Sequence, residues 1–358
     1  MLIDLASAAP STAQSRPRAI LITGANGEIG HGLIRRLYEL GERHLVALDL
    51  RDVAADLKPC CLRTFAGDIC EQETLDKVYA DFDYAVVFHL AAFLSTKGEH
   101  VPETAHRVNV DGTLNLLERS ARQGQAAGAP VRFIFPSSIA VYGIPNLNVK
   151  SSLPPVSESQ FLEPVTMYGC NKLSCEHLGR YYARHYRQLD RQLTRPGWID
   201  FRSVRLPGLI SAFTMPTGGT SDYAPEMIHA AAQGKPYPCF VREDAAIPFL
   251  AMPDAVEAII RLAQADASRL TRCVYNMGGF SPTAGEIAAL VRKAFPDARI
   301  TFEPHKQRQA IVDSWPARVD DAAARSDWQY SFEHDFLSAF NEYLIPNIRA
   351  HYASARRA

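Results

Sequence analysis

The sequence lacks the residue spacings of metal-binding and disulfide-stabilised proteins. Its seven cysteines contain no Cys-x-x-Cys pair, and Cys60 and Cys61 are adjacent, which suits neither a zinc site nor a disulfide framework. The eleven histidines include no His-x-x-x-His pair and no mixed His/Cys cluster. We therefore expect no metal, and we expect the thiols to stay reduced in a reducing compartment.

The sequence also lacks a strong charge of either sign and a long hydrophobic run. Lys plus Arg (38) nearly balance Asp plus Glu (39), so no whole-protein field attracts nucleic acid or an anionic membrane surface. Residues 1–17 are rich in Ala, Ser and Pro and have no basic start before their short apolar stretch. We interpret residues 1–17 and 351–358 as tails, the first of them disordered, on a cytoplasmic protein that acts on a small molecule.

Short apolar runs alternate with amphipathic stretches over the first two thirds of the chain, as when crossover helices join parallel strands. Several of the runs are apolar throughout, which is typical of strands covered on both faces. The pattern predicts an α/β fold with a doubly wound parallel sheet of the Rossmann type. Strands are expected at residues 19–23, 45–49, 63–66, 84–90, 131–136 and 201–206. Helices are expected at 29–40, 74–80, 102–123, 165–188, 223–233, 253–265, 284–294 and 334–351.

A glycine-rich turn stands between the first expected strand and the first expected helix. Residues 24–30 read Gly-Ala-Asn-Gly-Glu-Ile-Gly, so the spacing is G-x-x-G-x-x-G. Such glycines permit a tight turn and close backbone approach, while the helix N-terminus attracts a pyrophosphate. A plain loop is the alternative, but the strand–turn–helix context favours dinucleotide binding. The expected contacts are Gly24, Asn26, Gly27, Glu28, Ile29 and Gly30.

Residues at the ends of later strands favour NAD as the dinucleotide. Asp49 follows the glycines by about 20 residues or slightly more, where a carboxylate accepts both ribose hydroxyls and repels the extra phosphate of NADP. Arg51 stands close enough to weaken that preference. Asp68 is placed to touch the adenine or, alternatively, to cap a helix. Small side chains after the fourth strand would let the cofactor pass, although core packing also explains them. The remaining expected cofactor contacts are Ile69, Leu90, Ala91 and Ala92.

Tyr168 and Lys172 are four residues apart and therefore share one face of a helix. A free tyrosine has a pKa of about 10, and a nearby cation stabilises the phenolate that can act as a base. Lys172 could also bind the nicotinamide ribose, and Ser138 could steady the reacting oxygen of the substrate, with Ser137 as the competitor. Asn109 could hold Lys172 through a backbone or water contact, or could cap or pack its helix. An amphipathic surface pair is the alternative for the Tyr-x-x-x-Lys spacing alone, but these motifs occur together and in order.

With these residues in place, the chain from Arg18 onward resembles the extended short-chain dehydrogenase/reductase superfamily, also called the NAD-dependent epimerase/dehydratase superfamily. The resemblance implies that Ser138, Tyr168 and Lys172 form the catalytic triad. Within the superfamily the chain is most similar to the short-chain type of L-threonine 3-dehydrogenase. The segments that carry this similarity are 93–99, 136–141, 207–211, 218–223 and 308–316. An extra segment around residues 191–198 and the Gly-Cys-Asn inside the tyrosine motif depart from that family.

The resemblance implies that the chain oxidises the hydroxyl of L-threonine with NAD, giving 2-amino-3-oxobutanoate. It places Ser95, Thr220 and Trp315 around the amino acid, together with Ser138. Ser95 could instead cap a loop, Thr220 could shape a turn, and Trp315 could pack the smaller lobe. The resemblance also implies a homodimer that pairs through the helices at 102–123 and 165–188.

The same pattern predicts two domains. Residues 18–207 would form the NAD-binding Rossmann domain, to which residues 247–278 would return. Residues 208–246 and 279–350 would form a smaller, mostly helical substrate-binding lobe, because Pro- and Gly-rich loops replace the regular alternation after residue 206.

Two other functions compete with this one. A nucleotide-sugar epimerase or dehydratase would use the same triad, but residues 205–208 lack the Asn that such epimerases present, and residues 139–140 lack the acidic pair of dehydratases. A noncatalytic dinucleotide-sensing protein would usually have lost the Tyr or the Lys. An Arg-rich stretch from Arg180 to Arg195 could bind phosphate or could simply be a solvated helix end and loop.

Overall fold

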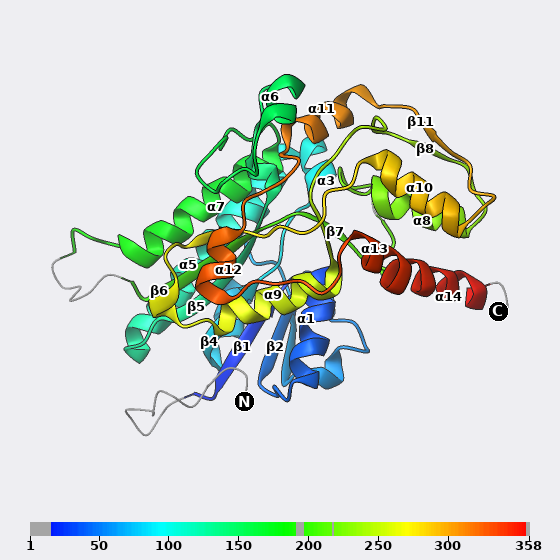
Figure 1. Cartoon of the computed structure of the whole chain (residues 1–358). Helices are drawn as coiled ribbons and strands as arrows, with labels where there is room; N and C mark the ends of the chain where they lie inside the picture. Colours follow the sequence, from blue (N-terminus) through cyan, green and yellow to red (C-terminus); the bar gives the residue numbers. More distant parts are fainter. Residues whose placement is uncertain (1–15, 191–196, 217, 356–358) are drawn as a thin grey trace.

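Seven parallel strands form the centre of the structure, a computed structural model that describes residues 16–190, 197–216 and 218–355 (Figure 1). Their order across the sheet is β10-β6-β5-β4-β1-β2-β3, which confirms the predicted doubly wound α/β class. Six strands match the predicted ones to within two residues. The seventh, β10, has three residues, too few for a periodic signal. The strands are β1 (Arg18–Thr23), β2 (Leu45–Asp49), β3 (Arg63–Ala66), β4 (Asp83–His89), β5 (Val131–Ser138), β6 (Ile199–Leu206) and β10 (Val274–Asn276).

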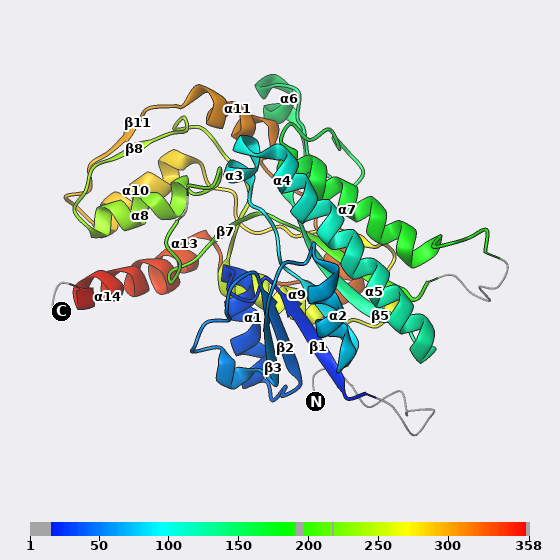
Figure 2. The same cartoon turned by 180° about the vertical axis from the view of Figure 1, so that it is seen from behind.

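Helices cover both faces of this sheet because its strands are apolar on both sides. In β1, Ile20 and Ile22 pack with α1 and α9, whereas Ala19 and Leu21 pack with α2, α5 and α7. Figure 2 shows α5 and α7 from their own side of the sheet. The covering helices are α1 (Glu28–Glu39), α9 (Met252–Gln264) and α12 (Ala322–Trp328) on one face, and α2 (Gln72–Ala80), α5 (Gly112–Ala127) and α7 (Met167–Arg184) on the other.

The predicted helix at 102–123 is divided into three parts. A π-helical segment, η2 (Arg107–Asp111), joins α4 (Pro102–His106) to α5. The hydroxyl of Thr113, in the first turn of α5, donates to the carbonyl of Asn109 in this segment at 2.6 Å, so a side chain competes with the backbone for that acceptor. Such π segments occur frequently at functional sites, and this one lies beside the sheet edge where β4 ends.

A second hydrophobic cluster holds the smaller lobe together. It gathers Tyr223 and Met227 from one helix, and Ile287 and Phe340 from two others. The predicted helix at 334–351 is divided into α13, η5 and α14, and α14 reaches residue 355, so most of the predicted tail at 351–358 is helical. The lobe contains α8 (Tyr223–Ala232), β8 (Tyr237–Cys239), α10 (Ala284–Ala294), β11 (Ile300–Phe302), α11 (Lys306–Ser314), α13 (Phe336–Ser338), η5 (Ala339–Leu344) and α14 (Ile345–Ala355).

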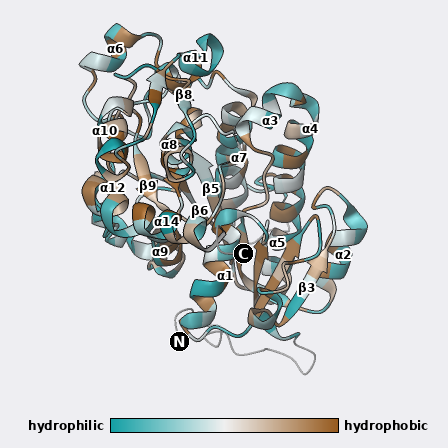
Figure 3. Ribbon diagram, turned by 90° about the vertical axis from the view of Figure 1, so that its right-hand side faces the viewer, coloured by the Kyte–Doolittle hydropathy of each residue, from teal (hydrophilic) through white to brown (hydrophobic). Residues whose placement is uncertain are grey.

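Short elements connect the two parts. The parallel pair β7–β9 links the end of β6 to the start of α9. Figure 3 shows hydrophilic residues on the outer helix α3. The connecting elements are η1 (Lys58–Cys60), α3 (Ser95–His100), η3 (Ile139–Val141), α6 (Leu147–Ser152), β7 (Gly208–Ile210), β9 (Phe249–Ala251) and η4 (Ala267–Arg269).

Some predictions fall outside the described residues. Residues 1–15 of the predicted N-terminal tail and 191–196 of the extra segment belong to this group. Arg16, which is described, forms an ion pair with Asp83 at 2.7 Å. Over the described ranges, every helix is too short or too polar to cross a membrane.

Candidate active site

The glycine turn lies between β1 and α1, against the end of β4. Gly24 has a φ of +70°, and a Cβ there would lie 2.6 Å from the backbone nitrogen of Ala91. A Cβ on Gly30 would collide with the carbonyl oxygen of Gly24. Both positions therefore require glycine, and the free surface of the turn is backbone. This cradle fits a dinucleotide pyrophosphate at the N-terminus of α1.

Asp49 lies beside this turn, as the sequence predicts. Its Oδ2 accepts a hydrogen bond from the backbone nitrogen of Asn26 at 2.9 Å, and its Oδ1 accepts one from that of Arg51 at 3.3 Å. The Asn26 side chain in turn binds the backbone of Asp52 and Ala54, which follow β2. The carboxylate at the end of β2 is thus held next to the glycines and stays partly exposed.

Glu28 and Ile29 begin α1 and point in different directions. Ile29 packs on the hydrophobic cluster between α1 and the sheet. Burial raises the pKa of the Glu28 carboxyl, while hydrogen bonds with the side chains of Ser211 and Thr214 oppose that rise. The Glu28 side chain therefore reaches the segment that follows β7, so the cofactor turn and the smaller lobe are in contact.

Asp68 is held in the loop after β3. Its Oδ1 accepts from the backbone nitrogen of Cys70 at 2.8 Å, and its Oδ2 pairs with Arg107 at 3.1 Å. The N-cap of α2 is Glu71, so the helix-cap alternative for Asp68 is wrong. Ile69 beside it is buried, and a Cβ on Gly112 would lie 2.6 Å from its Cδ1. Ile69 therefore packs where α5 begins.

The loop after β4 is anchored to the end of β1. The backbone nitrogen of Leu90 donates to the carbonyl of Thr23 at 3.1 Å, and that of Ala91 donates to the Thr23 hydroxyl at 3.3 Å. Leu90, Ala91 and Ala92 are partly exposed. These small and apolar residues form the wall opposite Asp49 across the glycine turn.

Tyr168 and Lys172 occupy the first turns of α7, which is capped by the hydroxyl of Thr166. The Nζ of Lys172 donates to the carbonyl of Pro136 at 2.7 Å and lies 5.5 Å from the centre of the Tyr168 ring. It also lies 4.5 Å from the ring centre of Phe135. Two neighbouring residues of β5 therefore hold the ammonium group beside the phenol.

Burial shifts both groups toward their neutral forms. It lowers the pKa of Lys172 to about 8 and raises the pKa of Tyr168 above its ordinary value. The surroundings of the two groups are therefore poor in water, so an added positive charge would act strongly on the phenol.

The structure distinguishes the two serines at the end of β5. The hydroxyl of Ser137 is buried and donates to Oε1 of Glu176 at 2.5 Å. Ser138 is partly exposed, and its hydroxyl accepts from the backbone nitrogen of Ala140 at 3.1 Å, which leaves its own proton to donate. Ser138 is thus the serine with a donor left for a substrate oxygen.

Asn109 supports the loop after β4. Its side chain accepts from the backbone nitrogen of Phe93 at 2.7 Å and donates to the Phe93 carbonyl at 3.0 Å. Its own carbonyl accepts from Thr113 and from the thiol of Cys175. Lys172 donates to the Pro136 carbonyl, and among the described residues no direct hydrogen bond joins it to Asn109; a water-mediated contact stays a prediction.

The three predicted substrate segments meet around residues 218–220. The hydroxyl of Thr96, next to Ser95, donates to the carbonyl of Gly218 at 2.9 Å. Arg308, at the start of the third segment, donates to the carbonyl of Gly219 at 2.7 Å. Thr220 is buried beside these contacts.

Trp315 ends the third segment with a buried side chain. Its exposed fraction is 5%, and it belongs to the core of the smaller lobe. Its indole Nε1 has no hydrogen-bond partner among the described residues. A buried donor of this kind costs free energy until a ligand or water accepts from it.

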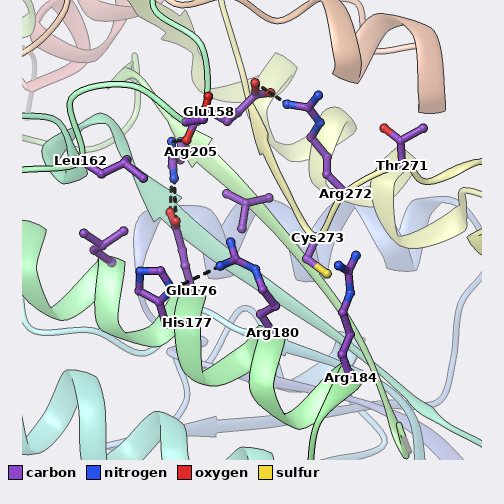
Figure 4. Close-up of a pocket in the computed structure, with 13 residues that line it drawn as sticks. Glu158, Leu162, Glu176, His177, Arg180, Arg184, Arg205, Thr271, Arg272 and Cys273 are labelled. Carbon is purple, nitrogen blue, oxygen red and sulfur yellow. Dashed lines mark hydrogen bonds and ion pairs between the residues drawn. The ribbon is translucent and has the colours of Figure 1, made fainter.

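Glu176 and Arg205 form a buried ion pair that the sequence did not predict. Two hydrogen bonds join them at 2.9 and 2.7 Å, and their side chains are 1% and 2% exposed (Figure 4). Arg205 lies in β6, a strand buried along most of its length. A charged residue in such a strand needs a buried partner, and that signal could have revealed the pair.

Comparison with known proteins identifies the family. Residues 20–278 match the NAD dependent epimerase/dehydratase family. An uncharacterized epimerase/dehydratase of Staphylococcus haemolyticus is 34% identical over 332 residues, covering 92% of this chain and 97% of that protein. Mitochondrial L-threonine 3-dehydrogenase of Bos taurus is 31% identical over 332 residues, covering 91% of this chain and 81% of that protein.

Solved structures give the same result. The holo form of a GalE-like L-threonine dehydrogenase from Cupriavidus necator is 35% identical with a TM-score of 0.78, covering 93% of this chain and 99% of that one. A monomeric L-threonine 3-dehydrogenase from a metagenome database, in its apo form, is 33% identical with a TM-score of 0.79, with the same coverage. These matches in sequence and in fold show that this chain belongs to the NAD-dependent epimerase/dehydratase family and is an NAD-dependent oxidoreductase.

Proposed function

We propose that this enzyme oxidises the hydroxyl of L-threonine to give 2-amino-3-oxobutanoate, with NAD as the acceptor. The observation that carries the chemistry is the ammonium of Lys172, fixed by the Pro136 carbonyl beside the ring of Tyr168. The similarity to L-threonine dehydrogenases over more than nine tenths of the chain supports the choice of substrate.

In this proposal Tyr168 is the general base. Its phenolate takes the proton of the threonine hydroxyl while a hydride leaves the carbon that bears this hydroxyl. Ser138 donates a hydrogen bond to the oxygen that becomes the ketone. Bound NAD+ would accept the hydride, and its ring charge would add to that of Lys172 in favouring the phenolate. Burial raises the pKa of Tyr168, and positive charge beside the phenol would oppose that rise.

The substrate would lie between the glycine turn and the smaller lobe. The unpartnered indole N–H of Trp315 supplies one donor for its carboxylate. Ser95 and Thr220 come from segments that the Thr96–Gly218 hydrogen bond joins. Closure of the lobe over these residues would keep water from the transfer.

We also propose a preference for NAD over NADP. The Asp49 carboxylate lies beside the turn and would accept the ribose hydroxyls, and its negative charge opposes an added phosphate. Asp68, Ile69, Leu90, Ala91 and Ala92 would complete the adenosine and ribose side of the site. Asn109 would act indirectly, because its side chain holds the loop after β4 at Phe93.

The test is turnover by the purified protein with NAD+ and either L-threonine or UDP-glucose, followed by the absorbance of the reduced cofactor. We expect the signal with L-threonine alone. Tyr168→Phe should lower kcat/KM by roughly 10²- to 10⁴-fold, the usual contribution of a general base. Tyr38→Phe, near the end of α1, keeps the ring that packs against Arg43 and is the control; it should leave turnover unchanged. Full turnover by Tyr168→Phe would show that Tyr168 is not the general base. Cofactor reduction with UDP-glucose but not with L-threonine would show that the proposed substrate is wrong.

Domain arrangement, assembly and location are further parts of the proposal. Residues 18–207 and 247–278 would bind the dinucleotide, and the smaller lobe would bind the amino acid. A homodimer would pair through the helices predicted at 102–123 and 165–188, in the cytoplasm, although one similar enzyme is described as monomeric. Light scattering on a size-exclusion column measures the mass directly, and a mass near 39.6 kDa would contradict the dimer.

A further inference from the structure

A pocket separate from the proposed active site lies on the flank of α7, at the outer edge of the sheet. The C-terminal half of α7, the loop before it and the segment leading into β10 line this pocket, whose volume is about 350 Å³ (Figure 4). At about 30 Å³ per water molecule, that volume holds roughly ten waters or one small organic ion. The proposed reaction uses none of the side chains that point into it.

The pocket has its own place on the helix. Residues 173, 177, 180 and 184 repeat at helical spacing and form one stripe of α7. Tyr168 and Lys172 lie on a different face, and Arg180 and Arg184 follow Lys172 by 8 and 12 residues, or about 12 and 18 Å along the axis. A ligand in this pocket is therefore remote from the proposed reacting atoms.

The positive charges in the pocket exceed the negative ones. Arg205 is neutralised by Glu176, and Arg272 by Glu158 at 2.6 Å. Arg180 contacts the Nδ1 of His177 at 3.2 Å, and neither Arg180 nor Arg184 has an acidic partner within the described ranges. The two guanidinium groups thus remain uncompensated at positions i and i+4, where like charges destabilise a helix.

We propose that this pocket is a binding site for a small anion that carries at least two acidic groups, held by Arg180 and Arg184. A dianion would remove the repulsion between the two arginines and would receive paired N–H donors from each. Leu162 and Leu173 give the pocket an apolar wall for a short carbon skeleton. Of the two interpretations of the Arg-rich stretch, anion binding is thereby assigned to its first two arginines.

Carboxylates and phosphates share the chemistry that this site recognises, and the experiment separates them. Calorimetric titrations of the full chain with citrate and with inorganic phosphate, at constant ionic strength, measure each dissociation constant. The Arg180→Gln/Arg184→Gln variant removes both ligands of the anion. Lys77→Gln/Arg122→Gln removes the same charge from exposed pairs on α2 and α5 and is the matched control.

A second measurement locates the bound anion. Cys273 lines the pocket, whereas Cys170 is exposed near the start of α7 and is absent from the lining. We expect saturating anion to slow alkylation of Cys273 at least threefold, with no change at Cys170, as read by peptide mass spectrometry. The single variant Arg184→Gln, at an exposed position, should weaken protection without affecting folding.

The expected result is saturable binding of at least one anion, weakened tenfold or more in the double arginine variant and unchanged in the control. Tighter binding of citrate assigns the site to carboxylates, and tighter binding of phosphate assigns it to phosphate esters. Absence of saturable binding, equal weakening in both double variants, or equal protection of the two cysteines would overturn the proposal. None of these outcomes depends on turnover of L-threonine, so the two proposals fail separately.

Discussion

Replacing Glu176 by Gln should destabilise this protein strongly, because it leaves the charge of Arg205 buried without a counter-ion. The carboxylate receives two hydrogen bonds from the guanidinium and one from Ser137. An amide keeps one acceptor oxygen, but its NH2 group would face another donor. The change therefore removes both the negative charge and at least one charge-assisted hydrogen bond.

The magnitude follows from the burial of the pair. Breaking a buried pair by removing one partner typically costs about 3–5 kcal/mol. The other contacts of Arg205, to the Tyr142 hydroxyl at 2.9 Å and the Glu158 carbonyl at 2.8 Å, are to neutral groups and cannot balance its charge. With side-chain exposures of 1% and 2%, solvent screening gives little relief. We therefore expect a loss near the middle of that range.

Denaturant unfolding followed by fluorescence and by circular dichroism measures this loss. Glu73→Gln, which breaks an exposed pair with Lys77, is the matched control and should leave the midpoint unchanged. The double variant Glu176→Leu/Arg205→Met should recover most of the stability, because it removes both buried charges together. If Glu176→Gln unfolds at the same denaturant concentration as the parent, or if the double variant is less stable than the single one, the reasoning is refuted.

Three further predictions concern the proposed active site. Burial lowers the pKa of Lys172 from 10.5 to about 8. The buried charge therefore lowers the free energy of unfolding below pH 8, and this destabilisation disappears as the pH rises from 8 toward 10.5. Lys172→Met should thus gain stability relative to the parent at pH 7, by up to about 3 kcal/mol, and the gain should shrink at pH 10; a pH-independent difference in denaturant midpoints would contradict this. Asp49→Asn should raise the ratio of kcat/KM for NADP to that for NAD by about tenfold or more, since a negative charge beside the added phosphate is removed. An unchanged ratio would show that Asp49 does not cause the preference for NAD. Trp315→Phe should raise the KM for L-threonine by about tenfold, the effect of one hydrogen bond to a charged group. Trp328→Phe removes another buried indole N–H that has no hydrogen-bond partner among the described residues, and it should not change this KM. Equal effects of the two substitutions would refute a substrate contact of Trp315.

Much of the fold could be predicted because its signals are local. Strands buried on both faces are mainly apolar, and this composition marks most of β1, β2, β4 and β5 among the seven strands of the sheet. The seventh, β10, is short, and its place at the edge depends on pairing with β6, about 70 residues earlier. The π-helical break at Asn109 was equally hidden, because the apolar periodicity continues through it and the side chains of Thr113 and Cys175 take up the Asn109 carbonyl only in the folded chain.

Some features of the proposed site could likewise be predicted from the sequence, and others depend on the tertiary structure. The spacing of Tyr168 and Lys172 places them on one helical face whatever surrounds the helix. Two adjacent serines are equivalent in the sequence, and only the resemblance favoured Ser138; the physical difference between them depends on Glu176, 39 residues along the chain from Ser137. The free indole N–H of Trp315 likewise emerged only once the lobe had packed around it.

The amino-acid sequence by itself determined the alternation of strands and helices, the glycine turn and the relative positions of residues within one helix, since these depend on periodicity and on neighbouring residues. The tertiary structure decided which polar groups are buried, which of them find partners, and which arginines of α7 are left without an acid. Burial and charge pairing arise from contacts between distant parts of the chain, and desolvation makes those contacts decisive for pKa and for binding.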